Sequence, residues 1–494
     1  MDAFLTPFVE KMNLLLQDGI NTKRSGRIIN VKVLTLCCCV DTVARAEMQC
    51  IVGHNGYNCC SWCLIQGENV NGTVKFPIPD DIPRDRTERH YKKCYTLYAK
   101  GNKKSNVEGI KGISPLVNLI SFRMVWGFVP DYMHCVLQGV TKRWIRLWMN
   151  NVDKQYYIGD PKNIGRIDDR MKRIRPPTLL KRLPFLMKNS KDMRKARELE
   201  NWLLFYSVPV LSGILPGEIL KHWKLLVSAM HLLLQDSVPV DTIHEDELLL
   251  IEFVCKTQLI YVKGEMTYNV HQLLHLAESV RKWGPLWSHT AFPFENAIGV
   301  LKRVVKGARG IPHQVTRSLE LKSSREIMMS SGFCGSEVVD FCESITVRDV
   351  NKSYRLAEGT FFGKPSDYFD SVDGLQENQT YTQHRKVIRN DVIYERFVDG
   401  DTRRFDNSYV ELNNGDFAHL MNILLCKETS ECHVIIKILN CHAVEGLRHL
   451  RIITGIQPEV ACKFSMVKNV AIFIDVLSEQ YVASVPSCHY KMNL

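Results

Sequence analysis

The chain has 494 residues, of which 45% are apolar and 24% charged, and its formal net charge is +11. These values are typical of soluble globular proteins with two or three domains, and they exclude disordered, fibrous and very small disulfide-rich chains. Seventeen cysteines, with a run at 37–39 and no secretory signal, indicate reduced thiols in the cytosol or nucleus. Prolines and a glycine interrupt the longest apolar stretch, 202–220, so no membrane span is expected.

The first elements predict a helix, a strand and an acid, in that order. Residues 3–18 carry apolar side chains at helical spacing, and Gly19 follows as a stop. Residues 28–40, IINVKVLTLCCCV, form an apolar run rich in β-branched residues, which predicts a central strand buried on both faces and leading into Asp41. This order is that of the middle of an RNase H-like sheet.

Two cysteines and two histidines, far apart in the chain, have the spacing of metal ligands. Cys60 and Cys63 form a Cys-x-x-Cys pair, which alone is also compatible with buried small side chains or a redox pair. His271 and His275 lie one helical turn apart, so both imidazoles can approach one ion. Together the four side chains satisfy a closed tetrahedral zinc site. The separation of 208 residues between Cys63 and His271 excludes a simple zinc finger.

A strongly basic block lies between Lys142 and Arg197. It holds seventeen lysines and arginines against five aspartates, a net charge of +12. Such a block suits contact with a polyphosphate backbone, and it is equally compatible with a solvated helical face.

The middle of the chain offers two further acids. Asp131 precedes an apolar helix in VPDYMHCVLQGV, so helix capping is favoured over catalysis, and His134 follows as a candidate metal ligand or buried hydrogen-bonding residue. Glu295 begins a predicted helix in AFPFENAIGVLKRVVKGARG. Its carboxylate either interacts with the helix dipole or, together with Asp41, holds divalent ions for phosphodiester chemistry.

The pattern of polar and apolar residues differs between three successive parts of the chain. Residues 74–112 are polar with little periodicity and predict a loop or mobile insertion. Residues 113–330 are mostly helical in pattern. From about 376 onward, short β-rich runs such as HVIIKILN and VAIFIDVLS predict a small β domain.

The strings GHNGYNCCSWCLIQGE, VPDYMHCVLQGV, NVHQLLHLAESVRKWGPLWSHTAFPFENAIGVLKRVVKGARG and YVASVPSCHY resemble the transposases of CACTA (En/Spm-type) DNA elements. The resemblance covers most of residues 1–320. It implies a DDE-group enzyme with an RNase H-like fold, in which Asp41 is the second catalytic acid and Glu295 the last. The spacings of nineteen residues from Asp41 to Cys60 and twenty from His275 to Glu295 are similar to those in the V(D)J recombinase catalytic subunit, whose corresponding residues bind zinc.

The resemblance also gives an overall architecture. The expected fold class is α+β, with an incomplete RNase H-like core interrupted by a large helical insertion that a zinc ion holds, and a small β-rich C-terminal domain. The expected parts are 1–50 (partial core), 51–270 (mostly helical insertion with the zinc knuckle), 271–330 (ligand helix and Glu295 helix), 331–375 (linker) and 376–494 (β-rich domain).

The family's first catalytic Asp lies on a strand upstream of the opening helix, so the sequence is expected to be an N-terminally truncated copy. The expected cofactors are structural Zn²⁺ and, in a complete site, catalytic Mg²⁺ or Mn²⁺. The expected partners are DNA and a second copy of the chain, with no membrane and no small-molecule substrate, and the expected location is the nucleus. The candidate DNA contacts are Lys142, Arg143, Lys172, Arg173, Arg175, Lys181, Arg182, Lys302, Arg303 and Lys306.

Two functions follow. The first is a transposase that, in its complete form, cuts DNA at element ends and joins the freed 3′ hydroxyl to a target. The alternative is a catalytically inactive, zinc-stabilised relic or domesticated protein that binds DNA or other proteins.

Overall fold

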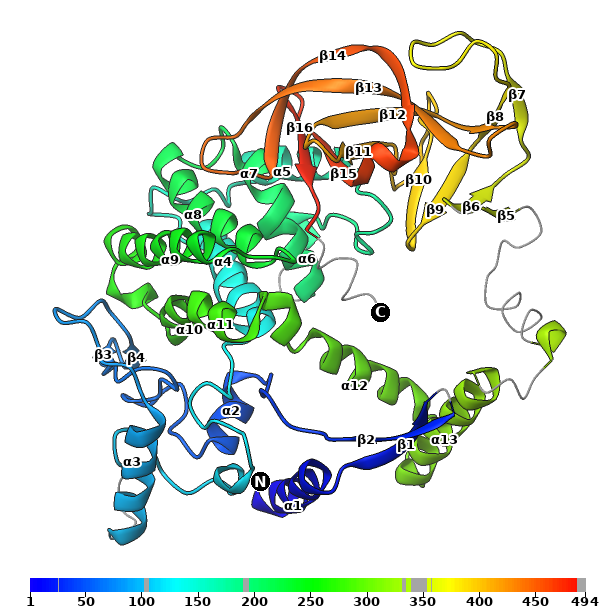
Figure 1. Cartoon of the computed structure of the whole chain (residues 1–494). Coiled ribbons are helices and arrows are strands. Elements are labelled where there is room, and N and C mark those ends of the chain that lie inside the picture. The colour runs from blue at the N-terminus through cyan, green and yellow to red at the C-terminus, as the bar shows by residue number, and fades with distance from the viewer. Residues whose placement is uncertain are drawn as a thin grey trace.

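The structure is a computed structural model that describes residues 1–24, 26–101, 106–189, 195–330, 335–338, 353–356 and 358–486. The chain is an α+β protein, as expected. Helices fill most of the first two thirds, and strands form the last third (Figure 1). Within the described ranges, no helix combines the length and apolar character needed to cross a bilayer.

The α-helices are α1 (Asp2–Gln17), α2 (Thr42–Met48), α3 (Glu88–Lys100), α4 (Lys142–Asn150), α5 (Pro161–Arg173), α6 (Ala196–Asn201), α7 (Ser207–Leu211), α8 (Gly217–Leu233), α9 (Val240–Tyr261), α10 (Tyr268–Gln272), α11 (Leu276–Trp283), α12 (Phe292–Val304) and α13 (Ile311–Ser330). The 3₁₀ and π segments are η1 (Pro115–Asn118), η2 (Met133–Thr141), η3 (Met187–Asn189), η4 (Trp202–Tyr206), η5 (Lys263–Glu265), η6 (Leu273–His275), η7 (Leu286–His289) and η9 (Phe464–Met466).

The strands are β1 (Ile20–Arg24), β2 (Arg27–Val31), β3 (Glu68–Val70), β4 (Thr73–Lys75), β5 (Ser353–Leu356), β6 (Gly359–Phe362), β7 (Ser366–Tyr368), β8 (Tyr381–His384), β9 (Lys386–Arg389), β10 (Val392–Glu395), β11 (Tyr409–Leu412), β12 (Phe417–Cys426), β13 (Cys432–Ala443), β14 (Leu450–Lys463), β15 (Val467–Asp475) and β16 (Gln480–Ser484).

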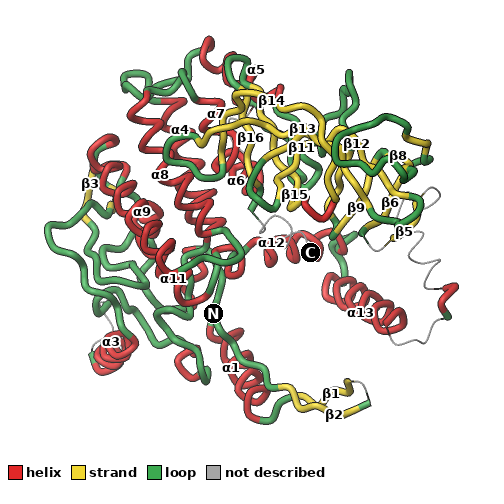
Figure 2. Tube along the Cα trace, turned by 45° about the horizontal axis from the view of Figure 1, so that its top comes forward, coloured by secondary structure: helices red, strands yellow, loops and turns green. Residues whose placement is uncertain are grey.

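The predicted buried strand at 28–40 is wrong. Its first residues form β2, which pairs only with β1 in an antiparallel hairpin and is exposed along its whole length. Figure 2 shows this hairpin projecting from the body of the molecule. The apolar run correctly indicated extended backbone, but a strand is buried only where neighbouring strands and helices cover its two faces. Ile28 and Leu36 are 77% and 59% exposed.

The end of the same run makes a parallel contact with a distant segment. The Cys38 backbone N–H donates to the Gly127 carbonyl over 2.7 Å, and Cys38 bridges Phe128 in parallel orientation. Asp41 follows Cys38 by three residues, and Asp131 follows Phe128 by three. Both acids therefore lie just beyond the carboxyl ends of two adjacent extended segments, the edge at which parallel strands present functional side chains.

Two apolar cores organise the described part of the first 290 residues. One runs from Leu5 to Phe128, includes the knuckle residues Cys60 and Cys63, and reaches Tyr268 on α10. The other is a larger helical core, in which Trp148 Nε1 donates to the Tyr261 hydroxyl over 3.1 Å. The knuckle thus packs with Leu5, Val9 and Ala46 and with residues 51–128, and not in the larger helical core.

Strands of the C-terminal region complete the helical core. The sheet has the order β11-β15-β16-β14-β13-β12-β8-β7, and an added β11–β12 pairing closes six of its strands into a barrel. Ile472 and Ile474 of β15, with Tyr481 and Ala483 of β16, belong to the same apolar core as α8 and α9. The β-rich region therefore packs onto the helices instead of standing apart (Figure 1).

One boundary and one helix differ from expectation. Strands begin at Ser353, inside the expected linker 331–375, because β5 and β6 pair with each other and β6 pairs with β9. Much of the rest of that linker lies outside the described residues. The polar segment 74–112 contains α3, whose first turn is capped by the Thr87 hydroxyl accepting the His90 N–H. The sequence analysis missed this helix because the segment is polar.

Candidate metal centre and acidic pocket

The four predicted metal ligands converge on one point. Cys60 Sγ lies 3.4 Å from His275 Nε2 and 3.3 Å from His271 Nε2, and Cys63 Sγ lies 3.3 Å from His271 Nε2. The two Nε2 atoms are 3.2 Å apart. A tetrahedron with metal–ligand bonds of about 2.0–2.3 Å has edges of about 3.3–3.8 Å. The spacing of the four atoms therefore fits a single tetrahedral ion, and the cluster can hold a metal such as zinc.

Backbone N–H groups of the Cys60–Cys63 knuckle point at its two sulfur atoms. The Trp62 backbone N–H points at Cys60 Sγ over 3.5 Å, and the Ile65 backbone N–H donates to Cys63 Sγ. Cys60, Cys63 and His271 are each at most 4% exposed. Amide N–H groups directed at sulfur stabilise thiolates in a site from which water is excluded.

A hydrogen bond between the two thiols shifts their pKa values in opposite directions. Burial opposes ionisation of Cys60, but the hydrogen bond from Cys63 and the two nearby imidazoles together hold the pKa of the Cys60 thiol well below its usual value. The same hydrogen bond, aided by burial, raises the pKa of Cys63. A divalent ion would displace the proton of this hydrogen bond and neutralise both thiolates, which couples ion binding to proton release.

A buried arginine joins the two halves of this centre. Arg45, on α2, is 2% exposed and stacks 4.5 Å from the ring centre of Trp62. Its Nη2 donates to the Tyr268 hydroxyl over 3.1 Å and to Gln272 Oε1 over 2.9 Å. Because Tyr268 and Gln272 flank His271 on α10, Arg45 fixes the ligand helix against the knuckle.

We expect Arg45→Lys to weaken zinc binding at this centre by about 10- to 100-fold, the usual cost of losing an outer-sphere contact. A lysine ammonium cannot reproduce the planar fork that reaches two acceptors while stacking on an indole. Competition with a chelator measures the affinity. Arg89→Lys, at an exposed position of α3, is the matched control and should leave it unchanged. Equal affinities in both variants would contradict the proposal that Arg45 holds α10 against the knuckle.

Asp131 has the predicted capping role and a second one. Its Oδ2 accepts the backbone N–H of His134 over 2.9 Å, which confirms the cap. Its Oδ1 accepts the Thr290 hydroxyl over 3.0 Å and the Ala291 N–H over 2.7 Å. Asp131 is 2% exposed, so a buried carboxylate ties the start of η2 to the start of α12, the helix that carries Glu295.

His134 is oriented by the same carboxylate. Its Nδ1 donates to Asp131 Oδ2 over 2.7 Å. This hydrogen bond, followed by the charges of Asp131, Asp41 and Glu295, raises the pKa of His134 against the opposing effect of burial. Both predicted catalytic acids are therefore close enough to His134 to favour its charged form.

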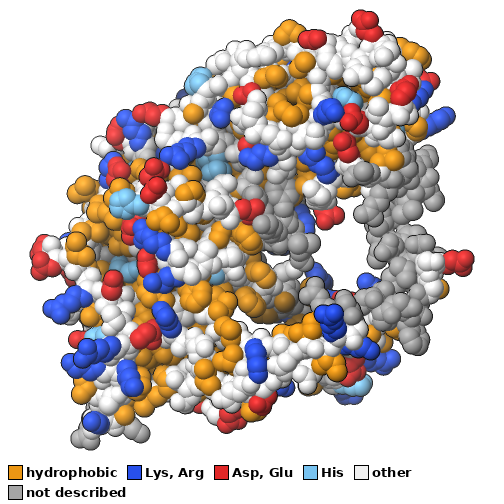
Figure 3. Space-filling view, in the orientation of Figure 1, with side chains coloured by type: hydrophobic (Ala, Val, Ile, Leu, Met, Phe, Trp, Pro, Cys, Tyr) orange, Lys and Arg blue, Asp and Glu red, His pale blue; other side chains and the backbone are white. Residues whose placement is uncertain are grey.

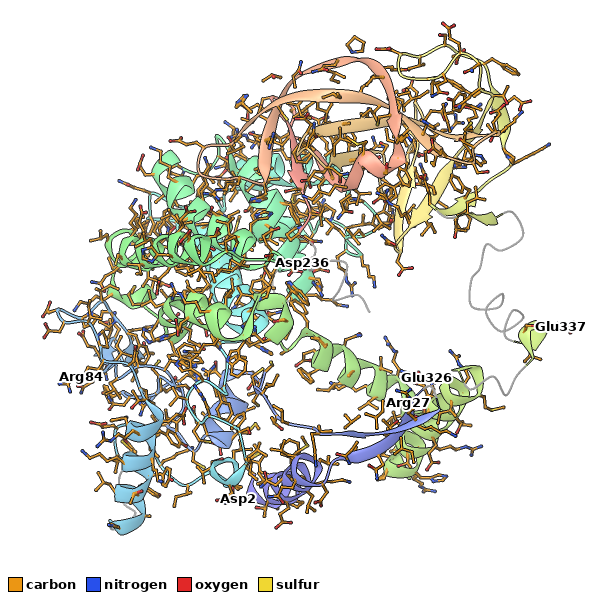
Figure 4. The ribbon with its side chains drawn as sticks, viewed as in Figure 1. Asp2, Arg27, Arg84, Asp236, Glu326 and Glu337 are labelled. Carbon is orange, nitrogen blue, oxygen red and sulfur yellow. The ribbon has the colours of Figure 1, made fainter. Side chains whose placement is uncertain are left out.

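Asp41 and Glu295 differ in their surroundings. Asp41 Oδ1 accepts the Ala44 N–H over 2.7 Å and so caps α2, while Glu295 is exposed in the first turn of α12. Among the described residues, neither acid belongs to a group of three convergent metal ligands. The residues present thus do not complete the expected Mg²⁺ or Mn²⁺ site, and the catalytic role of both acids stays a prediction. Asp2 lies on α1 at the lower edge of the molecule (Figure 4).

A pocket of about 970 Å³ brings Glu295 and His134 together with positive charge. The cations along its wall are Lys181, Arg182, Lys195 and Arg197. Arg197 also pairs with Glu200 over 2.7 Å and stacks 4.1 Å from the Phe292 ring centre. Asp41 is not among the lining residues. A basic wall facing an acid and a histidine suits a phosphate-containing ligand.

The predicted DNA contacts divide into two groups. Three of them contact residues that are distant in the sequence: Arg143 pairs with Glu265 over 2.5 Å, Arg173 with Asp475 over 3.4 Å, and Arg175 donates to the Asp401 carbonyl over 2.6 Å. Lys172 pairs with Asp169 on its own helix over 3.0 Å, and Lys142 is half-buried. Lys181 and Arg182 line the pocket, and Lys302, Arg303 and Lys306 are exposed on and just after α12.

Charges of both signs lie on the face of the molecule that Figure 3 shows, where lysine and arginine side chains are interspersed with acidic ones. Of the two predicted catalytic acids, only Glu295 shares the pocket with the four cations. Lys195 and Arg197 belong to the basic block but were not singled out from the sequence, because spacing alone does not show which cations face Glu295.

No protein-family model and no curated protein sequence matches this chain.

Proposed function

We infer that this protein is derived from a CACTA-type DNA transposase, that its buried Cys₂His₂ centre holds structural zinc, and that the pocket between η2 and α12 binds a DNA strand. The observation that carries this proposal is the pocket itself, where Glu295 and the Asp131-oriented His134 face four cations. We further propose that the protein acts in the nucleus and self-associates.

A structural role for zinc follows from the centre's four protein ligands. A closed tetrahedral site has no position for substrate. The ion would join Cys63 to His271 across the helical insertion, and so would restrict the unfolded chain and stabilise the fold. This arrangement supports zinc as a part of the scaffold that positions α2 and α12, not as a reactant.

An RNase H-like core is the proposed setting for the acids. The parallel contact between Cys38 and Phe128, with an acid three residues beyond each, supports it. So do the apolar side chains that α1 and α12 leave in solvent: Phe4 is 80% exposed and Phe294 57%. Further strands of such a sheet would cover these faces.

The alternative is a protein that binds DNA or another protein without cutting. It is favoured by the incomplete carboxylate set around Asp41 and Glu295 in the described part of the chain. In that case the pocket would hold a phosphodiester backbone through its cations, with His134 donating a hydrogen bond to a phosphate oxygen, and no bond would break.

The test is DNA binding and cleavage by the full chain. Lys181→Gln/Arg182→Gln is expected to weaken binding to duplex DNA and to reduce the slope of log K against log salt by about two, one for each lost phosphate contact. Binding is measured by fluorescence anisotropy over a salt series. Cleavage in Mg²⁺ that Glu295→Gln abolishes would select the enzyme, and salt-sensitive binding without cleavage would select the alternative.

Matched controls make the result specific. Lys154→Gln/Lys162→Gln removes the same charge from exposed positions of the same basic block outside the pocket, and Glu320→Gln neutralises an exposed acid on α13. Both should behave as wild type. An equal loss of binding in the two double variants would mean that net charge, not the pocket, attracts DNA, and would overturn the proposed site.

A further inference from the structure

Three potential metal ligands converge at a second place, on α3. His90 and Cys94 lie one turn apart on this helix, and Glu108 reaches them from the loop that precedes Gly109. Cys94 Sγ lies 3.6 Å from both His90 Nε2 and Glu108 Oε2, and the imidazole contacts the carboxylate directly. One ligand atom from each side chain lies within 4.8 Å of the other two.

The backbone holds Glu108 in this position at a cost. Its φ is +45°, a conformation that non-glycine residues seldom adopt, and Gly109 follows with φ +89°. A Cβ on Gly109 would lie 2.0 Å from the Asn58 carbonyl oxygen, so only glycine fits. Arg86 Nη2 donates to the Glu108 carbonyl over 3.1 Å. The turn is thus fixed by its surroundings, and it directs the carboxylate at α3.

We propose that His90, Cys94 and Glu108 form a second metal site for a zinc-class divalent ion, with three protein ligands and one open position. A histidine–glutamate ion pair alone would need no third group. Here a thiol that is 2% exposed lies beside both groups, although neutral sulfur is a weak hydrogen-bond partner for either. As a thiolate it is a strong ligand for zinc.

The donor set decides the class of ion. Thiolate, imidazole and carboxylate together suit Zn²⁺ or Co²⁺, whereas Mg²⁺ and Ca²⁺ prefer oxygen ligands alone. The side chains of His90 and Glu108 are 22% and 55% exposed, so water reaches the fourth position. The ion should therefore bind more weakly and exchange faster than at the buried Cys₂His₂ centre.

Arg86 links the two centres. Its Nε donates to the Cys60 carbonyl over 3.2 Å, while its Nη2 reaches Glu108. The knuckle also pairs with the residues just before Arg86, since the Leu64 N–H donates to the carbonyl of Arg84, labelled in Figure 4, over 2.9 Å. An ion on α3 would thereby stiffen the support of the first centre without entering it.

The deciding measurement is the number of zinc equivalents per chain. Metal-free full-length protein is loaded with Zn²⁺, passed through gel filtration and analysed by mass spectrometry of the metal. Wild type is expected to carry one equivalent more than Cys94→Ser. Glu108→Gln should weaken the second equivalent by at least about tenfold in chelator competition, because a neutral amide is a poor ligand. Co²⁺ loading should show a thiolate charge-transfer band that decreases in Cys94→Ser.

The controls separate this site from other thiols. Cys255→Ser, at a half-buried position of α9, should keep every equivalent, and Cys60→Ser should lose the buried ion while keeping the one on α3. Equal zinc content in wild type and Cys94→Ser overturns the proposal. Since Glu108 is exposed, Glu108→Gln should fold as wild type, so an unchanged affinity in that variant is equally decisive. These readouts do not depend on DNA binding.

Discussion

Replacing Cys60 with alanine is expected to abolish zinc binding at the buried centre and to lower the free energy of unfolding by more than about 5 kcal/mol, since binding at structural zinc sites is worth about 10–16 kcal/mol. Three ligands would remain, with His271 and Cys63 buried beside an empty volume. Arg45 and the hydrogen bond from the Tyr268 hydroxyl to the Cys59 carbonyl would still join the knuckle to α10. Chemical denaturation of the zinc-loaded full chain, followed by circular dichroism, measures the loss.

The neighbouring cysteine provides the control. Cys59 is 3% exposed and packs in the same apolar core, but it is not one of the four ligands. Cys59→Ala should cost about 1 kcal/mol, the price of a small cavity, and should keep the metal. A chelator should destabilise wild type and Cys59→Ala equally and destabilise Cys60→Ala much less, because that variant has no ion at the buried centre to lose. Similar losses in both variants would show that packing, not an ion, carries the stability of the knuckle.

The convergence of the four candidate ligands could be predicted from their residue types and spacing. A Cys-x-x-Cys turn and two histidines at helical spacing leave few arrangements in which all four atoms meet, and the helix around His271 supplies the spacing locally. The contacts of Arg45 with Trp62, Tyr268 and Gln272 could not be predicted in the same way. Arg45 is a single arginine four residues after Asp41, and only the fold shows that it lies beneath Trp62.

The strand at 28–40 shows why burial could not be predicted. The sequence pattern indicates that a segment prefers extended backbone, whereas burial depends on what other segments supply as neighbours. Ile28 and Val31 have the side chains of a central strand, yet they lie in a hairpin with 77% and 43% of their surface exposed. Conversely, α3 is polar in composition and still forms a helix, because Tyr91 and Cys94 pack on one face.

The surroundings of His134 were predicted only in part. The resemblance indicated Asp41 and Glu295, and both influence His134 in the fold. The sequence could not show that Asp131 connects His134 to α12, since that contact depends on the Thr290 and Ala291 groups at the far end of the helical region. The same Asp131 carboxylate caps η2 and orients His134, and both functions depend on its burial.

Asp131→Ala is accordingly the second substitution with a large expected effect, a loss of about 3–5 kcal/mol in the free energy of unfolding. It would leave the N–H groups of His134 and Ala291 and the Thr290 hydroxyl without their buried acceptor. The pKa of His134 should fall, because the hydrogen bond that raises it most is removed. Denaturant unfolding measures the first effect, and the imidazole resonances in a pH titration measure the second.

The pH dependence of stability separates this role from simple packing. The folded pKa of His134 lies above its ordinary value of about 6.5, so its pair with Asp131 stabilises wild type fully below that value and progressively less as pH rises through the raised pKa. The pKa of Asp131 is lowered by His134 and backbone hydrogen bonds despite burial, so its contribution is lost only as pH falls below the ordinary range of Asp. Asp131→Ala should abolish both dependences. Asp160→Ala, which removes a comparable helix cap at the surface of α5, should cost less than Asp131→Ala and keep the wild-type dependence on pH in the range where His134 titrates. A pH profile in Asp131→Ala that still follows wild type would mean that the titrating histidine is not held by this carboxylate.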